Sequence, residues 1–219
     1  MAHKHKPNIG IVGGVGSGKS AVARWLADEY HGLLIDADAV GHQVLLRDDV
    51  KARLRDVFGD EIFVDGEIAR SRLAGHVFGD DPERVVARKR LESIVHPVMG
   101  EVFKRELKAG AEDPSVQMMI IDAAILLEAG WRDGCDVLAF VDVPREQRLQ
   151  RVAESRGWSE DELAGREASQ WPLDRKRELS DVVIDNSGTI EQAGQQLADY
   201  LFREDWVSSE PSHNIVSTS

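Results

Sequence analysis

The stretch Ile9–Ser20 reads IGIVGGVGSGKS and decides the fold. An apolar run stops at Gly13, and after four intervening residues Gly18-Lys19-Ser20 completes the pattern of a phosphate-binding loop. Glycines let the backbone turn tightly and direct several N–H groups at one point, and the following helix adds its positive N-terminal end. The sequence therefore predicts a nucleoside-triphosphate site, with eight candidate ATP-binding residues: Gly13, Gly14, Val15, Gly16, Ser17, Gly18, Lys19 and Ser20.

Two side chains of this loop are expected to carry chemistry. Lys19 offers a mobile ammonium to the terminal phosphates and is a candidate catalytic residue, while the Ser20 hydroxyl is a hard oxygen ligand for Mg²⁺. A glycine-rich turn that contains Gly-Lys-Ser by chance is the alternative interpretation. The flanks argue against it, because Val22, Leu26 and Tyr30 follow at helical spacing, so the loop opens a helix.

The charge balance and the cysteine count limit the kinds of molecule that this protein can be expected to bind. The 219 residues suit one α/β core with an insertion, and 39 acidic against 27 basic residues give a net charge of −12. This balance argues against non-specific binding to nucleic acid or to an anionic membrane. The single cysteine, Cys135, permits no internal disulfide, and no apolar stretch suits a signal peptide or a membrane span. We expect a cytoplasmic protein, either a monomer or a small homo-oligomer, whose partners are small molecules.

Five short apolar runs are typical of strands buried on both faces of a parallel sheet: 8–12, 33–35, 116–121, 137–141 and 182–184. Four of them run straight into an aspartate, at the strand ends where such sheets bind ligands. Asp122 has the position of a carboxylate near Mg²⁺, so Ser20 and Asp122 are the candidate metal ligands. For Asp142 and Asp185 we favour capping or local structure.

Two long connections separate the runs. Residues 41–112 show several helical patterns and predict an all-helical insertion that holds the phosphoryl acceptor. Residues 146–178 are rich in arginine, and Arg148 and Arg151 share a helical face. We expect a helical lid that brings these two candidate catalytic cations to the phosphates, although a solvated charged helix is the alternative.

The remaining segments, 8–40, 113–145 and 179–203, form the expected nucleotide-binding core, and 207–219 an expected disordered tail. The predicted fold is a three-layer α/β phosphate-loop kinase fold with a five-stranded parallel sheet. A regulatory GTPase should carry an Asn-Lys-x-Asp segment, which is absent, and a motor ATPase would be larger. A small kinase remains.

Four segments together resemble the dephospho-coenzyme A kinase family: LIDAD (34–38), LESIVHPVM (91–99), LLE (126–128) and SDVVIDNSG (180–188). The resemblance extends from about Ile9 to about Tyr200. It implies transfer of the γ-phosphoryl group of ATP to the ribose 3′-hydroxyl of dephospho-coenzyme A, the last step of coenzyme A synthesis, with Mg²⁺. The alternatives are another small-molecule or nucleoside kinase on the same scaffold, or a nucleotide-dependent regulatory module.

The resemblance also suggests roles for individual residues. Asp38 matches the catalytic aspartate. Asp36 is a candidate acceptor-binding residue that would lie on the same side as Asp38 if the strand continued, and the alternative is that it only caps a helix. Arg70 and His96 correspond to acceptor-binding positions, although His96 could instead pack before a turn-forming proline.

Asn186 and Gly188 resemble a loop at the start of the last helix that touches adenine, with a helix cap as the alternative. The chain departs from the family at Ala124, where proline is common. This departure puts the local turn in doubt rather than the reaction.

Overall fold

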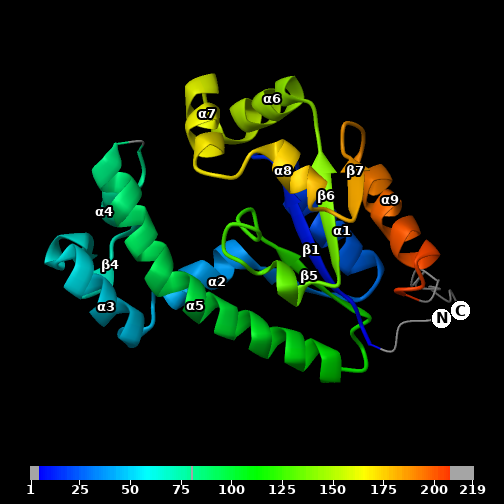
Figure 1. Ribbon diagram of the computed structural model, residues 1–219, viewed down its shortest axis with the longest axis horizontal. Helices are drawn as coiled ribbons and strands as arrows, with labels where there is room; N and C mark the ends of the chain where they lie inside the picture. Colours follow the sequence, from blue (N-terminus) through cyan, green and yellow to red (C-terminus); the bar gives the residue numbers. More distant parts are fainter. Residues whose placement is uncertain (1–4, 80, 208–219) are drawn as a thin grey trace, which may run out of the picture. The chain divides into compact units, whose positions relative to one another are not determined.

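The computed structural model describes residues 5–79 and 81–207 (Figure 1). Contacts divide the chain into two compact units. Unit 1 comprises Met1–Ile35 and Glu106–Ser219, and unit 2 comprises Asp36–Arg105. Each unit has its own packing and is described by itself.

A five-stranded parallel sheet forms the centre of unit 1, with the order β2-β5-β1-β6-β7. The strands are β1 (Asn8–Gly13), β2 (Gly32–Asp36), β5 (Met118–Asp122), β6 (Val137–Asp142) and β7 (Val182–Asp185). The prediction of five parallel strands is confirmed. The third strand begins two residues later than expected, at Met118 rather than Val116.

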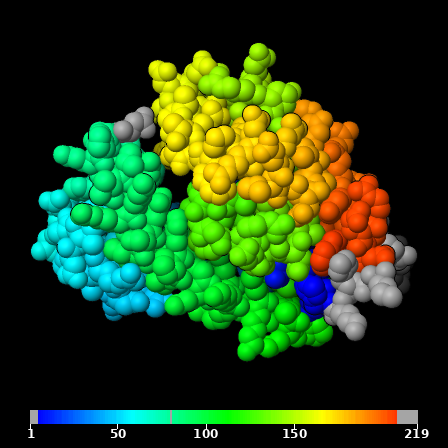
Figure 2. Space-filling view, viewed as in Figure 1, coloured from blue at the N-terminus to red at the C-terminus, as the bar shows by residue number. Residues whose placement is uncertain are grey.

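Both faces of this sheet are covered, which makes the predicted three layers. Ile9 and Ile11 share one core cluster with Leu26 of α1 (Lys19–Glu29) and Leu197 of α9 (Ile190–Arg203). Burying each such side chain stabilises the fold by about 1.5–3 kcal/mol. On the opposite face, a Cβ at Gly10 would lie 2.8 Å from Leu126 and Cys135, so the segment after β5 packs there. On the face shown in Figure 2, little of the blue N-terminal part of the chain is visible.

The lid region folds as three helices of unit 1, α6 (Arg145–Arg156), α7 (Glu160–Ala168) and α8 (Leu173–Glu178). α6 ends at Gly157, whose φ of 68° is left-handed. α7 begins with a capping box between Ser159 and Glu162, in which each side chain accepts the other residue's N–H. A short 3₁₀ helix, Arg132–Gly134, precedes β6.

The chain after α9 differs from the expected disordered tail at its first residue. Val207 is buried in the core cluster of unit 1, so the prediction of disorder is wrong for this residue. The rest of the predicted tail, 208–219, lies outside the described residues. Within 5–79 and 81–207, no helix is long and apolar enough to cross a membrane.

Unit 2 is mostly helical, with α2 (Ala37–Val44), α3 (Asp48–Phe58), α4 (Arg70–Val77), a 3₁₀ turn Asp60–Ile62 and the first part of α5 (Pro82–Glu112). The prediction of helices alone is wrong at one place, where β3 (Phe63–Val64) and β4 (Glu67–Ile68) form an antiparallel hairpin. Asp65 and Gly66 join them with φ of 51° and 82°. Two positive φ values in a two-residue loop match the twist of paired strands.

Pro97 lies inside α5, so the turn that the alternative interpretation of His96 assumed is wrong. A proline within a helix removes the bond to the carbonyl four residues earlier, that of Ser93. The flanking residues Ile94, Val95 and Val98 are buried on both sides of it. Their burial outweighs the local cost, so the helix continues through the proline.

Candidate active site

The phosphate loop, Gly13–Ser20, follows β1 and turns into α1 as its sequence requires. Gly16 and Gly18 have φ of 80° and 81°, a region that favours glycine. A Cβ at Gly13 would lie 2.7 Å from the Val141 carbonyl, so the close approach to β6 also requires glycine. Gly18 is the N-cap of α1, and the N–H groups of Lys19 and Ser20 are in the first turn, where no helical carbonyl reaches them. This arrangement suits an anion.

Three functional groups meet at the end of this loop. The Lys19 ammonium lies 3.2 Å from Asp122 Oδ1 and 3.3 Å from the Ser20 hydroxyl. Asp122 is the last residue of β5, and the parallel register sets it beside Ile11 of β1. Its side chain is only 6% exposed and that of Lys19 18%, so their attraction is weakly screened by solvent.

The oxygen atoms of Ser20 and Asp122 are a donor set that fits Mg²⁺. Both oxygens contact the Lys19 ammonium, Asp122 Oδ1 at 3.2 Å and the Ser20 hydroxyl at 3.3 Å. Mg²⁺ keeps several waters and is bound through one or two protein oxygens together with substrate phosphates. In the described part of the chain, no three His, Cys, Asp or Glu side chains gather as a ready metal cage.

Arg148 of α6 lies against the phosphate loop and is buried. Its guanidinium donates to the carbonyls of Val15 and Val143, each at 3.2 Å, and forms an ion pair with Glu167 of α7. A Cβ on Gly14 would lie 3.0 Å from Arg148 Nη1. A positive charge is therefore held directly beside the loop backbone.

Arg151 reaches the same loop one turn further along α6. It donates to the Asn186 carbonyl at 2.8 Å and to the Ser17 carbonyl at 3.4 Å. The Asn186 amide also donates to the Ser17 carbonyl, at 2.7 Å. Arg151 and Asn186 thus tie the phosphate loop to the segment after β7. Arg156, another arginine of α6, instead stacks 4.7 Å from the centre of the Trp158 ring.

The segment after β7 corrects the expected helix start. Asn186 and Gly188 do not cap α9, because Thr189 is its N-cap and forms a capping box with Gln192. Asn186 is fully buried against the phosphate loop, whereas Gly188 is exposed. Asp185 accepts the N–H of Ser187, a local contact of the kind that we favoured. Asp142 instead forms an ion pair with Arg177 of α8, 35 residues later in the chain.

Unit 2 contains the candidate base. β2 ends at Asp36, whose side chain accepts the Ala39 N–H at 3.0 Å and caps α2. The strand does not continue past Asp36, so the alternation of Asp36 and Asp38 along a strand does not occur, and Asp38 lies in the first turn of α2. Its side chain is exposed, and no hydrogen bond or ion pair engages it among residues 5–79 and 81–207.

The candidate acceptor-binding residues lie on other helices of unit 2. Arg70 is the exposed first residue of α4. His96 is half-buried on α5, and burial lowers its pKa while Glu92 opposes that shift. Gly41 of α2 lies against Met99 of α5, with a Cβ position 3.6 Å from the methionine methyl. Asp38 is one helical turn before Gly41, and His96 is one helical turn before Met99. Residues three apart share a helical face, so the face of α2 that carries Asp38 packs against the face of α5 that carries His96.

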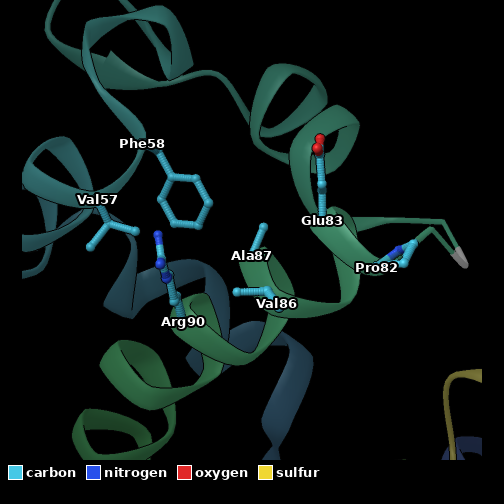
Figure 3. Close-up of a pocket in the computed structure, with 7 residues that line it drawn as sticks. All are labelled: Val57, Phe58, Pro82, Glu83, Val86, Ala87 and Arg90. Carbon is cyan, nitrogen blue, oxygen red and sulfur yellow. The ribbon is translucent and has the colours of Figure 1, made fainter.

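A hollow of about 430 Å³ lies between α3 and α5 of unit 2 (Figure 3). Its wall combines apolar side chains with one acid and one arginine: Val57, Phe58, Pro82, Glu83, Val86, Ala87 and Arg90. In Figure 3 the Arg90 side chain points from α5 toward Val57 and Phe58. None of the predicted site residues lines this hollow.

Sequence reasoning missed Lys176 of α8. Its side chain is completely buried, which is unusual for lysine unless the charge is paired. The ammonium donates to the Ala124 carbonyl and to the side chains of Glu128 and Gln170. Within the charged string DRKRE no local pattern distinguishes it from its exposed neighbours.

Comparison with known proteins agrees with this geometry. Residues 8–192 match the family model described as dephospho-CoA kinase. The chain belongs to the dephospho-CoA kinase family. A dephospho-CoA kinase of Rhodopirellula baltica is 39% identical over 187 residues, which are 85% of each chain. One of Thermobifida fusca is 37% identical and covers 87% of this chain and 92% of its own.

A solved structure gives the same fold. A crystal structure from Thermus thermophilus, 33% identical, covers 91% of this chain and 98% of its own, with a TM-score of 0.75. The phosphate-loop kinase fold expected from the sequence is confirmed. Dephospho-CoA kinases are ATP-dependent phosphotransferases, and this chain has the activity of its family. The site therefore has to hold ATP and an alcohol acceptor at once.

Proposed function

We propose that the chain transfers the γ-phosphoryl group of ATP to the ribose 3′-hydroxyl of dephospho-CoA, giving CoA and ADP. The convergence of Lys19, Ser20 and Asp122 at the phosphate loop carries this proposal. Backbone N–H groups of residues 13–20 bind the phosphates, and Lys19 neutralises charge on the terminal ones. Asn186 and Gly188 border the adenine.

Mg²⁺ would be held by Ser20 and Asp122 and would neutralise charge on the phosphate oxygens during transfer. Arg148 is the arginine that contacts the transferring phosphoryl group, because its guanidinium already lies beside Gly14. Arg151 supports the loop through the Ser17 and Asn186 carbonyls.

For the acceptor, Asp38 accepts the proton of the attacking hydroxyl, since a sugar hydroxyl is a weak nucleophile. Its exposed carboxylate is available for this task. Arg70 binds the acceptor pyrophosphate, where an arginine fork suits phosphate oxygens, and His96 contacts the acceptor as well. Asp36 orients this end of α2 through its cap.

We further propose a cytoplasmic monomer or small homo-oligomer that acts on small molecules alone. The single cysteine, Cys135, is buried and supports a reducing compartment.

The test is an acceptor panel. The purified full chain with Mg²⁺ and ATP is expected to release ADP in the presence of dephospho-CoA and to add one phosphoryl mass to it. ADP release with another alcohol and none with dephospho-CoA would contradict the proposal. Asp38→Asn should lower kcat by about 10²–10⁴-fold, as expected for the loss of a general base. Asp56→Asn, an exposed acid on α3, is the matched control and should leave kcat unchanged.

A further inference from the structure

Lys176 is the most deeply buried charge in the described part of unit 1, with no side-chain exposure. All three ammonium hydrogens have acceptors: the Ala124 carbonyl at 2.7 Å, Glu128 Oε1 at 2.8 Å and Gln170 Oε1 at 3.1 Å. Glu128 Oε1 also accepts the Trp171 N–H at 2.8 Å. A buried ammonium satisfied in this way holds its partners in one geometry.

These bonds join two segments that are distant in sequence. Ala124 and Glu128 belong to the loop after β5, while Gln170, Trp171 and Lys176 belong to the segment that contains α8. We name the residues Ala124, Glu128, Gln170 and Lys176 the lysine clasp. The clasp is the attachment of α8 to the loop after β5.

Both segments reach the phosphate loop. Ala124 is two residues beyond Asp122, which pairs with Lys19. Leu173, three residues before Lys176 on α8, would lie 3.2 Å from a Cβ on Gly14. A substitution at Lys176 would therefore be expected to shift Asp122 through Ala124 and to shift the surroundings of Gly14 through Leu173.

We propose that Lys176 is a positioning residue for phosphoryl transfer, which holds the loop after β5 so that Asp122 meets Lys19 beneath the phosphate loop. Lys176 does not touch ATP and acts through Ala124 and Asp122. The proposal rests on the phosphate-loop site described above. Burial lowers the pKa of Lys176, and the hydrogen bond and charge of Glu128 oppose this shift, so the ammonium depends on its partners.

The experiment separates positioning from mere stability. Lys176→Met leaves the Glu128 carboxylate unpaired, so it should lower Tm as well as kcat/KM for ATP. The double variant Lys176→Met with Glu128→Gln removes both charges and should recover most of the lost Tm. Because the Ala124 carbonyl still lacks its donor, kcat/KM for ATP should stay about tenfold or more below the original chain, with the KM for dephospho-CoA changed by less than about twofold.

Lys108→Met is the matched control, since Lys108 is 78% exposed and only 4.0 Å from Glu112; it should change neither quantity. Recovery of kcat/KM together with Tm in the double variant would overturn the proposal. If both clasp variants fail to fold, Gln170→Leu, which removes one bond and no charge, decides: kcat/KM for ATP should fall, and an unchanged value overturns the proposal. Binding of a fluorescent ATP analogue, measured without acceptor, keeps these results independent of the acceptor assignment.

Discussion

Gly16→Ala perturbs the contact between the phosphate loop and α6. Gly16 has φ of 80°, and a Cβ there would lie 2.8 Å from the Arg148 carbonyl and 2.9 Å from a Val152 methyl. Gly157→Ala is a matched control, because Gly157 has φ of 68° but nothing within 4 Å of its Cβ position. Both variants place alanine in left-handed backbone, and only the first also causes a clash.

The two magnitudes follow from these facts. Left-handed alanine costs about 1–2 kcal/mol, and the stiffer unfolded chain returns about 0.4–1 kcal/mol. Gly157→Ala should therefore cost about 1 kcal/mol. Gly16→Ala adds overpacking of about 1–3 kcal/mol, since neither a backbone carbonyl nor a β-branched side chain yields easily.

Urea unfolding followed by circular dichroism measures the stabilities, and steady-state kinetics the effect on ATP. We expect Gly16→Ala to lower kcat/KM for ATP by about tenfold or more, which corresponds to about 1.4 kcal/mol. Gly157→Ala should stay within about twofold. If the two variants lose equal stability and both keep normal kcat/KM, α6 does not contact Gly16 in solution and the description of the lid is refuted.

Three further predictions concern the rest of the chain. Gly194→Ala should lower the free energy of unfolding by about 1–3 kcal/mol, because its Cβ would lie 1.9 Å from the Trp25 ring, and this clash outweighs a gain of about 1 kcal/mol in helix propensity. Gly165→Ala is the control, since nothing lies within 4 Å of its Cβ position on α7; it should raise the free energy of unfolding by up to about 1 kcal/mol in the same urea assay. Burial raises the pKa of Cys135 to about 12, so the free energy of unfolding should fall as pH rises from 9 to 12, and mass spectrometry should find iodoacetamide labelling at pH 8 only after unfolding. Burial also lowers the pKa of His96, so as the pH falls the imidazole is protonated at a higher pH in the unfolded chain than in the folded chain. The free energy of unfolding should therefore fall as pH drops below 6.5, and His96→Gln should lessen that fall in denaturation curves measured over a series of pH values.

The sheet could be predicted because its strands are buried on both faces. Such strands read as unbroken apolar runs, and the aspartates at their ends mark the ligand edge. The hairpin at Phe63–Ile68 was missed because each strand has two residues, too few for any period to show. The alternative of a turn at Pro97 follows from the local preference of proline, whereas in the fold the burial of Ile94 and Val98 keeps this segment helical.

The candidate site divides in the same way. The phosphate loop is one continuous segment of the sequence, and the spacing of its glycines is specific to this loop conformation. Its residues could therefore be named from the sequence alone. Lys176 could not be, because its environment is made by Ala124 and Glu128, about fifty residues earlier in the chain. A charge buried by long-range contacts leaves no local signal.

Arg148 and Arg151 share one face of α6 but have different hydrogen-bond partners. Each would have to release a partner in order to bind the transferring phosphoryl group. Arg151 binds the Ser17 and Asn186 carbonyls. Its release would leave the Asn186 carbonyl without this donor, while the Ser17 carbonyl would keep the Asn186 amide as a donor. Arg148 is paired with the carboxylate of Glu167, an anion that a phosphoryl oxygen can replace with little change in the number of charge-assisted bonds. Glu167 is partly exposed and would be solvated again after the exchange. Because only Arg148 can exchange one anion for another, we infer that it is the arginine that serves the transferring phosphoryl group, while Arg151 keeps the loop in place.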